Sequence, residues 1–305
     1  MRHCTWIFRV CAIAAGFSAI AFSLPAQNAC YWVWQRDEPL DDRELAELTA
    51  QNVDTIYWHV GELENIGTTW RWKARFSFPT SGTERIRFVP VVRLVSRERQ
   101  SFSDASTTAL VASLSSVTAK HRELQLDCDT PDRLLEDYAA ALKRIHGLVP
   151  RLSLAALPHW GRADHLKVLE PAVDEFLPML YDFEAEPVLK NQRPLPLLSP
   201  EKITKLIDTW RACGKPWRAG LPVFARLSVY AANQKLRGQI RNWNWDELCF
   251  NRNLQVADHG EFGTTILRAN KPTFVANTTI NSDEKLIVRE VDRAALQNAI
   301  AAASR

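Results

Sequence analysis

The sequence predicts an α/β fold, a single (β/α)8 barrel of the TIM type, with a β-ribbon inserted after the second strand and a long seventh loop. Apolar runs rich in β-branched and aromatic residues recur eight times along the chain, and most are followed by an amphipathic helical pattern. These runs are dense in valine, leucine, isoleucine and phenylalanine, which is typical of parallel strands buried on both faces. The 305 residues suffice for one large barrel, and no linker rich in proline, glycine or serine divides them.

Strand and helix patterns alternate along the chain. The predicted strands are Tyr31–Arg36, Val53–His59, Ile86–Leu94, Glu123–Asp129, Leu152–His159, Glu175–Asp182, Trp217–Phe224 and Phe262–Arg268. The predicted helices are Asp41–Gln51, Asp104–Lys120, Pro131–Leu148, Arg162–Val173, Pro200–Cys213, Asp246–Val256 and Asp292–Ala303. This order of elements predicts a parallel sheet that closes on itself.

Two stretches depart from the alternation. Residues Trp70–Phe76 alternate large and basic side chains, which predicts a β-ribbon between the second and third strands. Their tryptophans could equally lie flat on the barrel as packing. Residues Ala225–Trp245 are predicted to form the long seventh loop, and such loops usually shape the substrate cleft of a barrel. We expect one barrel domain over residues 27–305.

Residues 1–26 are typical of a secretory signal peptide. Arg2 and Arg9 flank the start, the uncharged apolar run Val10–Phe22 follows, and cleavage is expected near Ala26. The run is short for a bilayer span, although an uncleaved anchor is the alternative. We therefore expect a periplasmic or secreted protein with no integral membrane segment after signal removal.

Export would place Cys30, Cys128, Cys213 and Cys249 in an oxidising compartment. Four cysteines allow three fully paired connectivities, and their spacing does not choose among them. The wide spacing also gives no zinc-ribbon pattern.

The composition excludes several classes of protein. With 46% hydrophobic and 24% charged residues, the chain is neither disordered nor fibrous. The formal net charge of +3 falls to +1 without the two arginines of residues 1–26, so the basic footprint of a nucleic-acid-binding protein is missing. The sequence contains no GxGxxG or GxxxxGK phosphate loop and no GxSxG motif. We expect no nucleic-acid partner.

The clearest functional pattern is Leu124–Asp129 on the fourth strand. Strand alternation places Gln125, Asp127 and Asp129 together on one face, which should be the face toward the barrel axis. Two axial carboxylates repel each other, so the pKa of at least one should rise, which suits acid–base work. The alternatives are a structural ion pair between Asp127 and an arginine of a neighbouring strand, and a helix-capping role for Asp129 or Thr130.

A second pattern is the apolar sixth strand, which ends in Tyr181 and Asp182. The phenol and the carboxylate could hydrogen-bond a substrate at the rim, or they could simply be polar residues at a strand end. We predict three catalytic carboxylates, Asp127, Asp129 and Asp182, with Asp129 or Asp182 as the proton donor, because a donor needs a raised pKa.

The remaining polar and aromatic residues at the strand ends are predicted to bind substrate. They are Trp34, Trp58, His59, Arg93, His159, Trp160, Tyr181, Glu184 and Arg226. Flat indole rings favour a carbohydrate, either an oligosaccharide or a polysaccharide, although core packing is the alternative for any single tryptophan.

A metal site is the weaker interpretation of the same strand ends. His59 and His159 with Asp127 and Asp129 could hold a divalent metal, but no HxH or HExxH spacing supports it. We therefore expect no metal and no other cofactor.

Two motifs resemble the family-18 chitinase-like barrels. Those proteins carry Asp-x-Asp-x-Glu at the end of strand four and Met-x-Tyr-Asp on strand six. The resemblance places Asp127 and Asp129 on the two aspartates, and Met179, Tyr181 and Asp182 on the strand-six motif. The chain departs from the family at Pro131, which stands where those enzymes keep their acid glutamate, so the resemblance supplies no proton donor there.

A wider resemblance is to domain-of-unknown-function family 3142, a group of uncharacterised bacterial proteins. It runs from Tyr-Trp-Val-Trp-Gln at residue 31 through Leu-Asp-Cys-Asp, Ala-Leu-Pro-His-Trp and Pro-Met-Leu-Tyr-Asp to Leu-Arg-Ala-Asn. This resemblance implies a glycosidase-like barrel and no established reaction.

These patterns lead to two hypotheses. The first is an exported, monomeric glycoside hydrolase-like enzyme that acts on a carbohydrate through rim carboxylates of strands four and six. The alternative is a non-catalytic barrel that binds a glycan or an envelope partner, which Pro131 favours.

Overall fold

The computed structural model describes residues 29–34, 36–79, 86–96, 100–181, 188–189, 194–259, 263–291 and 293–303. The expected signal peptide lies outside these ranges. The chain divides into two compact units: unit 1 contains Met1–Met179 and Thr209–Arg218, and unit 2 contains Leu180–Asp208 and Ala219–Arg305. Within the described ranges, no helix is both long enough and apolar enough to cross a membrane.

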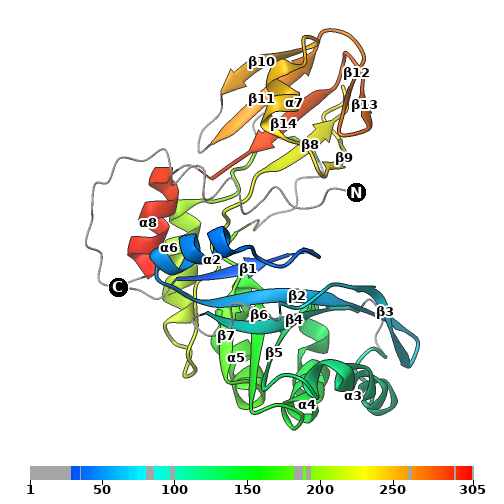
Figure 1. Ribbon diagram of the computed structural model, residues 1–305, viewed down its shortest axis with the longest axis vertical. Helices are drawn as coiled ribbons and strands as arrows, with labels where there is room; N and C mark the ends of the chain where they lie inside the picture. Colours follow the sequence, from blue (N-terminus) through cyan, green and yellow to red (C-terminus); the bar gives the residue numbers. More distant parts are fainter. Residues whose placement is uncertain are drawn as a thin grey trace. The chain divides into compact units, whose positions relative to one another are not determined.

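Unit 1 is built on a curled parallel sheet (Figure 1). Its strands, in spatial order, are β1 (Ala29–Val33), β2 (Val53–Ile66), β4 (Arg87–Val95), β5 (Glu123–Asp127), β6 (Arg151–Ala156) and β7 (Glu175–Pro178). Each pairs in parallel with the next. Trp217 adds an isolated parallel bridge to Phe176. This half-barrel confirms the predicted α/β class of the TIM type.

Helices and short 3-10 turns follow the strands, as the alternating pattern requires. They are α2 (Asp42–Ala50), α3 (Asp104–Thr118), η1 (Asp132–Leu134), α4 (Leu135–His146), η2 (Pro158–Gly161), α5 (Ala163–Leu169) and η3 (Glu170–Ala172). Helix α6 (Pro200–Trp210) begins in unit 2, and its last two residues belong to unit 1. Local sequence sets their starts. The Asp41 carboxylate accepts from the Glu44 amide and the Glu44 carboxylate accepts from the Asp41 amide, a capping box that begins α2.

Strand β2 continues past the end of β1, and its second half, which still pairs with β4 up to Glu64, also pairs with the antiparallel strand β3 (Thr69–Arg75). A bulge between His59 and Gly61 marks the place where β2 changes its register with β4. Of the tryptophans in this segment, Trp70 is buried and donates to the Ser106 hydroxyl, whereas Trp72 lies under the Arg75 guanidinium.

The amino end of the unit 1 sheet is closed by a buried ionic network. The Glu175 carboxylate accepts from Arg151 at 2.9 Å, from Arg218 at 2.9 Å and from the Tyr57 hydroxyl at 3.2 Å. Two arginines and a phenol thus compensate the burial of this charge. Polar groups at this end are occupied with one another, which directs the search for a site to the carboxyl end.

Unit 2 is an antiparallel α/β unit. Its five-stranded sheet has the order β10 (Leu254–His259), β11 (Thr264–Ala269), β14 (Lys285–Arg289), β8 (Arg226–Tyr230) and β9 (Leu236–Ile240). A small sheet of β12 (Thr273–Val275) and β13 (Thr278–Ile280) and the helices α7 (Trp245–Phe250) and α8 (Arg293–Ala303) complete it. Its core includes Leu227, Val229 and Ile240, against which Trp243 and Trp245 pack.

Unit 2 corrects three expectations about the end of the chain. The stretch Ala225–Trp245 is not a long loop, because it contains β8 and β9 with alternating buried apolar residues. The eighth predicted strand corresponds to β11, which is antiparallel to both neighbours. The predicted helix Asp246–Val256 ends at Phe250, and Leu254 begins a strand. An apolar period identifies a strand, but it does not identify the direction of its partner.

The cysteines at 30, 128, 213 and 249 are all unpaired in this structure. Burial raises the pKa of the Cys128 thiol to about 12, so this thiol stays protonated at neutral pH.

Candidate functional site

Four neighbouring strands of unit 1 bring polar and aromatic side chains to the carboxyl end of the sheet. Trp34 directly follows β1, His59 lies in β2, Arg93 in β4 and Asp127 at the end of β5. Arg93 and Asp127 are register partners across β4 and β5. Because parallel strands end at one edge, residues that are far apart in the sequence meet there. We call Trp34, His59, Arg93, Asp127 and Asp129 the carboxyl-edge cluster.

Arg93 lies at the centre of this cluster. Its Nη2 donates to Asp129 Oδ2 at 3.1 Å, and its Nη1 lies 3.8 Å from Asp127 Oδ2. Its guanidinium carbon also lies 5.5 Å from the centroid of the Trp34 ring, within cation–π range. One partly exposed cation therefore contacts two acids and an indole.

The two acids differ in burial. Asp127 is 3% exposed, whereas the side chain of Asp129 is 56% exposed. The pKa of Asp127 is raised to about 7, chiefly by burial; the Arg93 charge opposes this rise, and the charges of Asp129 and Glu62 add smaller increases. Asp127 can therefore hold a proton near neutral pH, and Asp129 is the carboxylate that solvent reaches. The alternative considered for Asp127, a pair with an arginine of a neighbouring strand, occurs here.

An aromatic stack forms the other side of the cluster. The rings of Trp34 and His59 are stacked, with centroids 3.7 Å apart and planes 13° apart. Phe76 lies 5.0 Å from the His59 ring, and Trp32 lies 5.4 Å from Trp34. Burial lowers the pKa of His59 to about 4, and the Arg93 charge acts in the same direction. His59 is therefore a neutral ring that supports Trp34, not a cation.

Gly61 allows β3 to lie close against β2 next to the aromatic stack. Its φ is +155°, and a Cβ there would clash with the Ala74 carbonyl oxygen and lie 2.8 Å from the Trp72 ring. Only glycine allows β3 to approach β2 this closely beside the bulge that follows His59.

Two predicted sugar-binding tryptophans are core residues in the structure. Trp58 is 1% exposed and donates from its indole nitrogen to the Ser77 carbonyl at 2.7 Å. Trp160 is fully buried, with its ring 6.4 Å from that of Tyr138. Neither ring presents a face to a ligand, because strand alternation and helix packing turn both into the interior.

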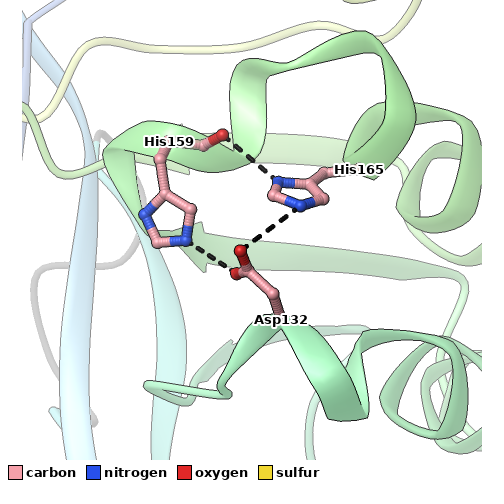
Figure 2. A group of neighbouring side chains, drawn as sticks. All are labelled: Asp132, His159 and His165. Atoms are coloured by element: carbon pink, nitrogen blue, oxygen red, sulfur yellow. Dashed lines mark hydrogen bonds and ion pairs between the residues drawn. The ribbon is translucent and has the colours of Figure 1, made fainter.

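His159 forms a group with Asp132 and His165 (Figure 2). Its Nε2 lies 2.8 Å from Asp132 Oδ1. The sequence did not lead us to Asp132 or His165. The only signal was that both follow strand ends, Asp132 after β5 and His165 shortly after β6.

Two other predicted residues belong to unit 2. Tyr181 lies 5.5 Å from Phe224 in an edge-to-face contact, and the guanidinium of Arg226 lies 5.7 Å from the same ring. Asp182 and Glu184 lie outside the described residues. The cluster of unit 1 therefore contains two of the three predicted catalytic acids.

Comparison with known proteins finds similarity at the level of fold. No family model matches the chain, and no curated protein matches it. The resemblance to family 3142 thus rests on its sequence motifs alone.

Several solved structures are similar at 12% identity. The spore cortex-lytic enzyme SleL of Bacillus megaterium aligns with a TM-score of 0.58 over 92% of this chain and 68% of its own. The protein ydhD of Bacillus subtilis, named as a sporulation-specific glycosylase, aligns with a TM-score of 0.53 over 80% and 87%. A family-18 chitinase of Cycas revoluta, solved with (GlcNAc)4, aligns with a TM-score of 0.51 over 82% and 85%. The chain is therefore similar in fold to glycoside hydrolases of family 18.

Proposed function

We propose that this protein is an exported glycoside hydrolase-like enzyme that acts on a carbohydrate at the carboxyl end of the unit 1 sheet. The observation that carries the proposal is the acid pair: a buried Asp127 with a pKa of about 7 and a solvent-exposed Asp129, both next to Arg93. Glycosidic hydrolysis needs a proton for the leaving oxygen and a second carboxyl group to assist attack at the sugar carbon.

The roles follow from exposure. Asp129 is the group that reaches the glycan, and Asp127 supplies its proton through Asp129 to the leaving glycosidic oxygen. Water attacks the anomeric carbon as the C–O bond breaks, and the proton that water loses returns to the acid pair. Asp182 remains our third catalytic candidate, as the carboxylate that assists attack.

Substrate binding would rest on stacking and on charged hydrogen bonds. Trp34, backed by the His59 ring, offers an indole face for a sugar ring, and Arg93 lies beside it. We also keep His159, Tyr181, Glu184 and Arg226 as proposed contacts. The names of the similar structures, a chitinase and spore cortex-lytic enzymes, favour a glycan that contains N-acetylhexosamine.

A second candidate function is non-catalytic glycan binding. Pro131, which stands where the family-18 barrels have their acid glutamate, precedes η1 and has no proton to donate. In this case the protein would bind the glycan through the Trp34–His59 stack without cleaving it. We also propose that the protein belongs to family 3142, that it is exported to the periplasm or beyond, and that it is a monomer.

One experiment separates the two functions. The purified protein is incubated with chitooligosaccharides and peptidoglycan fragments, and released reducing ends and glycan affinity are both measured. For an enzyme, Asp129→Asn should lower turnover by about 100-fold or more and leave affinity within about threefold. The matched control is Asp104→Asn, another exposed aspartate beside an arginine, which should change neither. Binding without turnover in the wild type would favour the second function.

A further inference from the structure

We propose that Asp132, His159 and His165 form a binding site for a divalent transition-metal ion of the zinc type, separate from the carboxyl-edge cluster. The three side chains converge in Figure 2, and their ligand atoms all lie within 4.8 Å of one another. Two imidazoles and one carboxylate are a ligand set that suits Zn²⁺ and its neighbours in the transition series. This goes against the expectation of no metal, which considered a different set of residues.

The fold explains why the three residues meet. Asp132 begins η1, which follows the turn after β5, and His159 lies in η2, which follows the neighbouring parallel strand β6. His165 lies in α5, which packs beside η2. The parallel order of β5 and β6 thus brings their carboxyl-end turns together, although no compact sequence motif marks the site.

The spacing is close to that of a metal site. Nε2 of His159 lies 2.8 Å from Asp132 Oδ1, and Nε2 of His165 lies 3.5 Å from Asp132 Oδ2. Ligands bound tetrahedrally to zinc at roughly 2.0–2.1 Å lie about 3.3–3.4 Å apart. These two separations lie on either side of that value and all three ligand atoms lie within 4.8 Å of one another, so the side chains would shift when an ion binds.

The hydrogen bonding of His165 supports the site independently. Its Nδ1 lies 3.3 Å from the backbone carbonyl oxygen of His159, which can only accept, so Nδ1 carries a proton. In the neutral ring, Nε2 then presents its lone pair to two carboxylates, Asp132 at 3.5 Å and Asp164 at 3.7 Å. Two carboxylates beside this nitrogen make its surroundings negative, which favours a metal cation there. The bond from Nδ1 to a carbonyl is also the usual way to orient a metal-binding imidazole.

The surroundings leave one side open. His165 is 8% exposed, whereas the side chains of His159 and Asp132 are each about half exposed. Arg162 holds Asp164 through two hydrogen bonds, at 2.9 and 3.3 Å, which keeps this acid from completing the set. A bound ion would therefore have three protein ligands and a fourth position open to water or another oxygen donor.

Direct metal binding tests the proposal without reference to glycan chemistry. Protein without a polyhistidine tag is stripped with a chelator and titrated with Zn²⁺ by calorimetry, and with Co²⁺ while the visible absorption is recorded. We expect one Zn²⁺ per chain and a cobalt spectrum typical of low coordination number. His165→Ala and the surface variant His159→Ala should each lower zinc affinity by at least about 100-fold, more than the loss of an outer-sphere partner costs.

The matched control is His146→Ala. His146 also pairs with an aspartate, Asp174, at 2.9 Å. Among the described residues, this pair is not part of the group that could hold a metal ion. Its removal should leave zinc affinity unchanged. If the wild type binds zinc no better than His159→Ala and His165→Ala do, the three side chains form only a hydrogen-bonded cluster, and the proposal is wrong.

Discussion

The Arg93 guanidinium lies 3.8 Å from the carboxylate of the buried Asp127, and this distance is too long for its charge to cancel the cost of burial. The pKa of Asp127 is consequently raised to about 7, although an arginine faces it. Arg93 instead makes its short hydrogen bond, 3.1 Å, to Asp129 at the surface. One cation thus holds an exposed carboxylate in place and leaves a buried one able to keep its proton.

This arrangement predicts an unusual dependence of stability on pH. The unfolded Asp127 has a pKa near 3.8 and the folded one about 7, so the folded state binds the extra proton between these values. The free energy of unfolding should therefore fall as pH rises from about 4 to 7, by up to roughly 4 kcal/mol. Asp127→Asn should remove this fall and be more stable than the wild type at pH 8. Urea titrations at pH 5 and pH 8 measure the free energy of unfolding of both proteins. An equal difference between variant and wild type at the two pH values would contradict the prediction.

His59 predicts a contribution of the opposite sign. Its pKa is lowered from 6.5 to about 4, so the unfolded state binds more protons in that interval. The free energy of unfolding should fall by up to roughly 3 kcal/mol as pH drops from 6.5 to 4. His59→Phe keeps a flat ring against Trp34 and should lack this acid loss. The same urea titrations test it at pH 4.5 and 6.5, and a variant that loses as much stability as the wild type would refute it.

Trp34 should carry much of the glycan affinity. Its ring is half-buried and supported by His59, so Trp34→Ala removes a prepared stacking face. We expect affinity to fall about 10-fold, the equivalent of one aromatic contact. Trp217→Ala is the control, because this half-buried tryptophan pairs with Phe176 near the start of β7 and not at the carboxyl ends of the strands. Equal losses in both variants would point to general destabilisation instead.

Gly61 should tolerate no side chain. Gly61→Ala places a Cβ against the Ala74 carbonyl and the Trp72 ring at a positive φ, which should lower the free energy of unfolding by about 2 kcal/mol or more. Gly238→Ala is the control, since nothing lies within 4 Å of its Cβ position. Thermal unfolding compares the two, and similar behaviour of both variants would show that the close approach of β3 is unimportant.

The strand that carries Asp127 could be predicted from the sequence, because a short apolar run is a local property. Leu124, Gln125 and Leu126 lead to it in strict order, and the structure buries all of them. The pairing of β4 with β5, which brings Arg93 to Asp127, depends on the order of strands in space. Sequence alone suggested an arginine partner without naming it.

The incorrect expectations share a physical cause. The apolar run near Leu267 was identified as a strand, yet its antiparallel partners at β10 and β14 are chosen by tertiary packing. Trp58 and Trp160 were expected at the rim because they lie near strand ends, but burial depends on what covers them. Asp132 and His165 were missed because their meeting depends on two turns that follow neighbouring strands.

The most direct test of the proposed function is the pH profile of glycan hydrolysis. Release of reducing ends from chitooligosaccharides and peptidoglycan fragments is measured from pH 4 to 9 for the wild type and Asp127→Asn. We predict wild-type activity that declines above about pH 7, as Asp127 loses its proton, and a variant at least about 100-fold slower throughout. A wild type that hydrolyses none of these glycans, or an Asp127→Asn variant with the wild-type rate and profile, would contradict it.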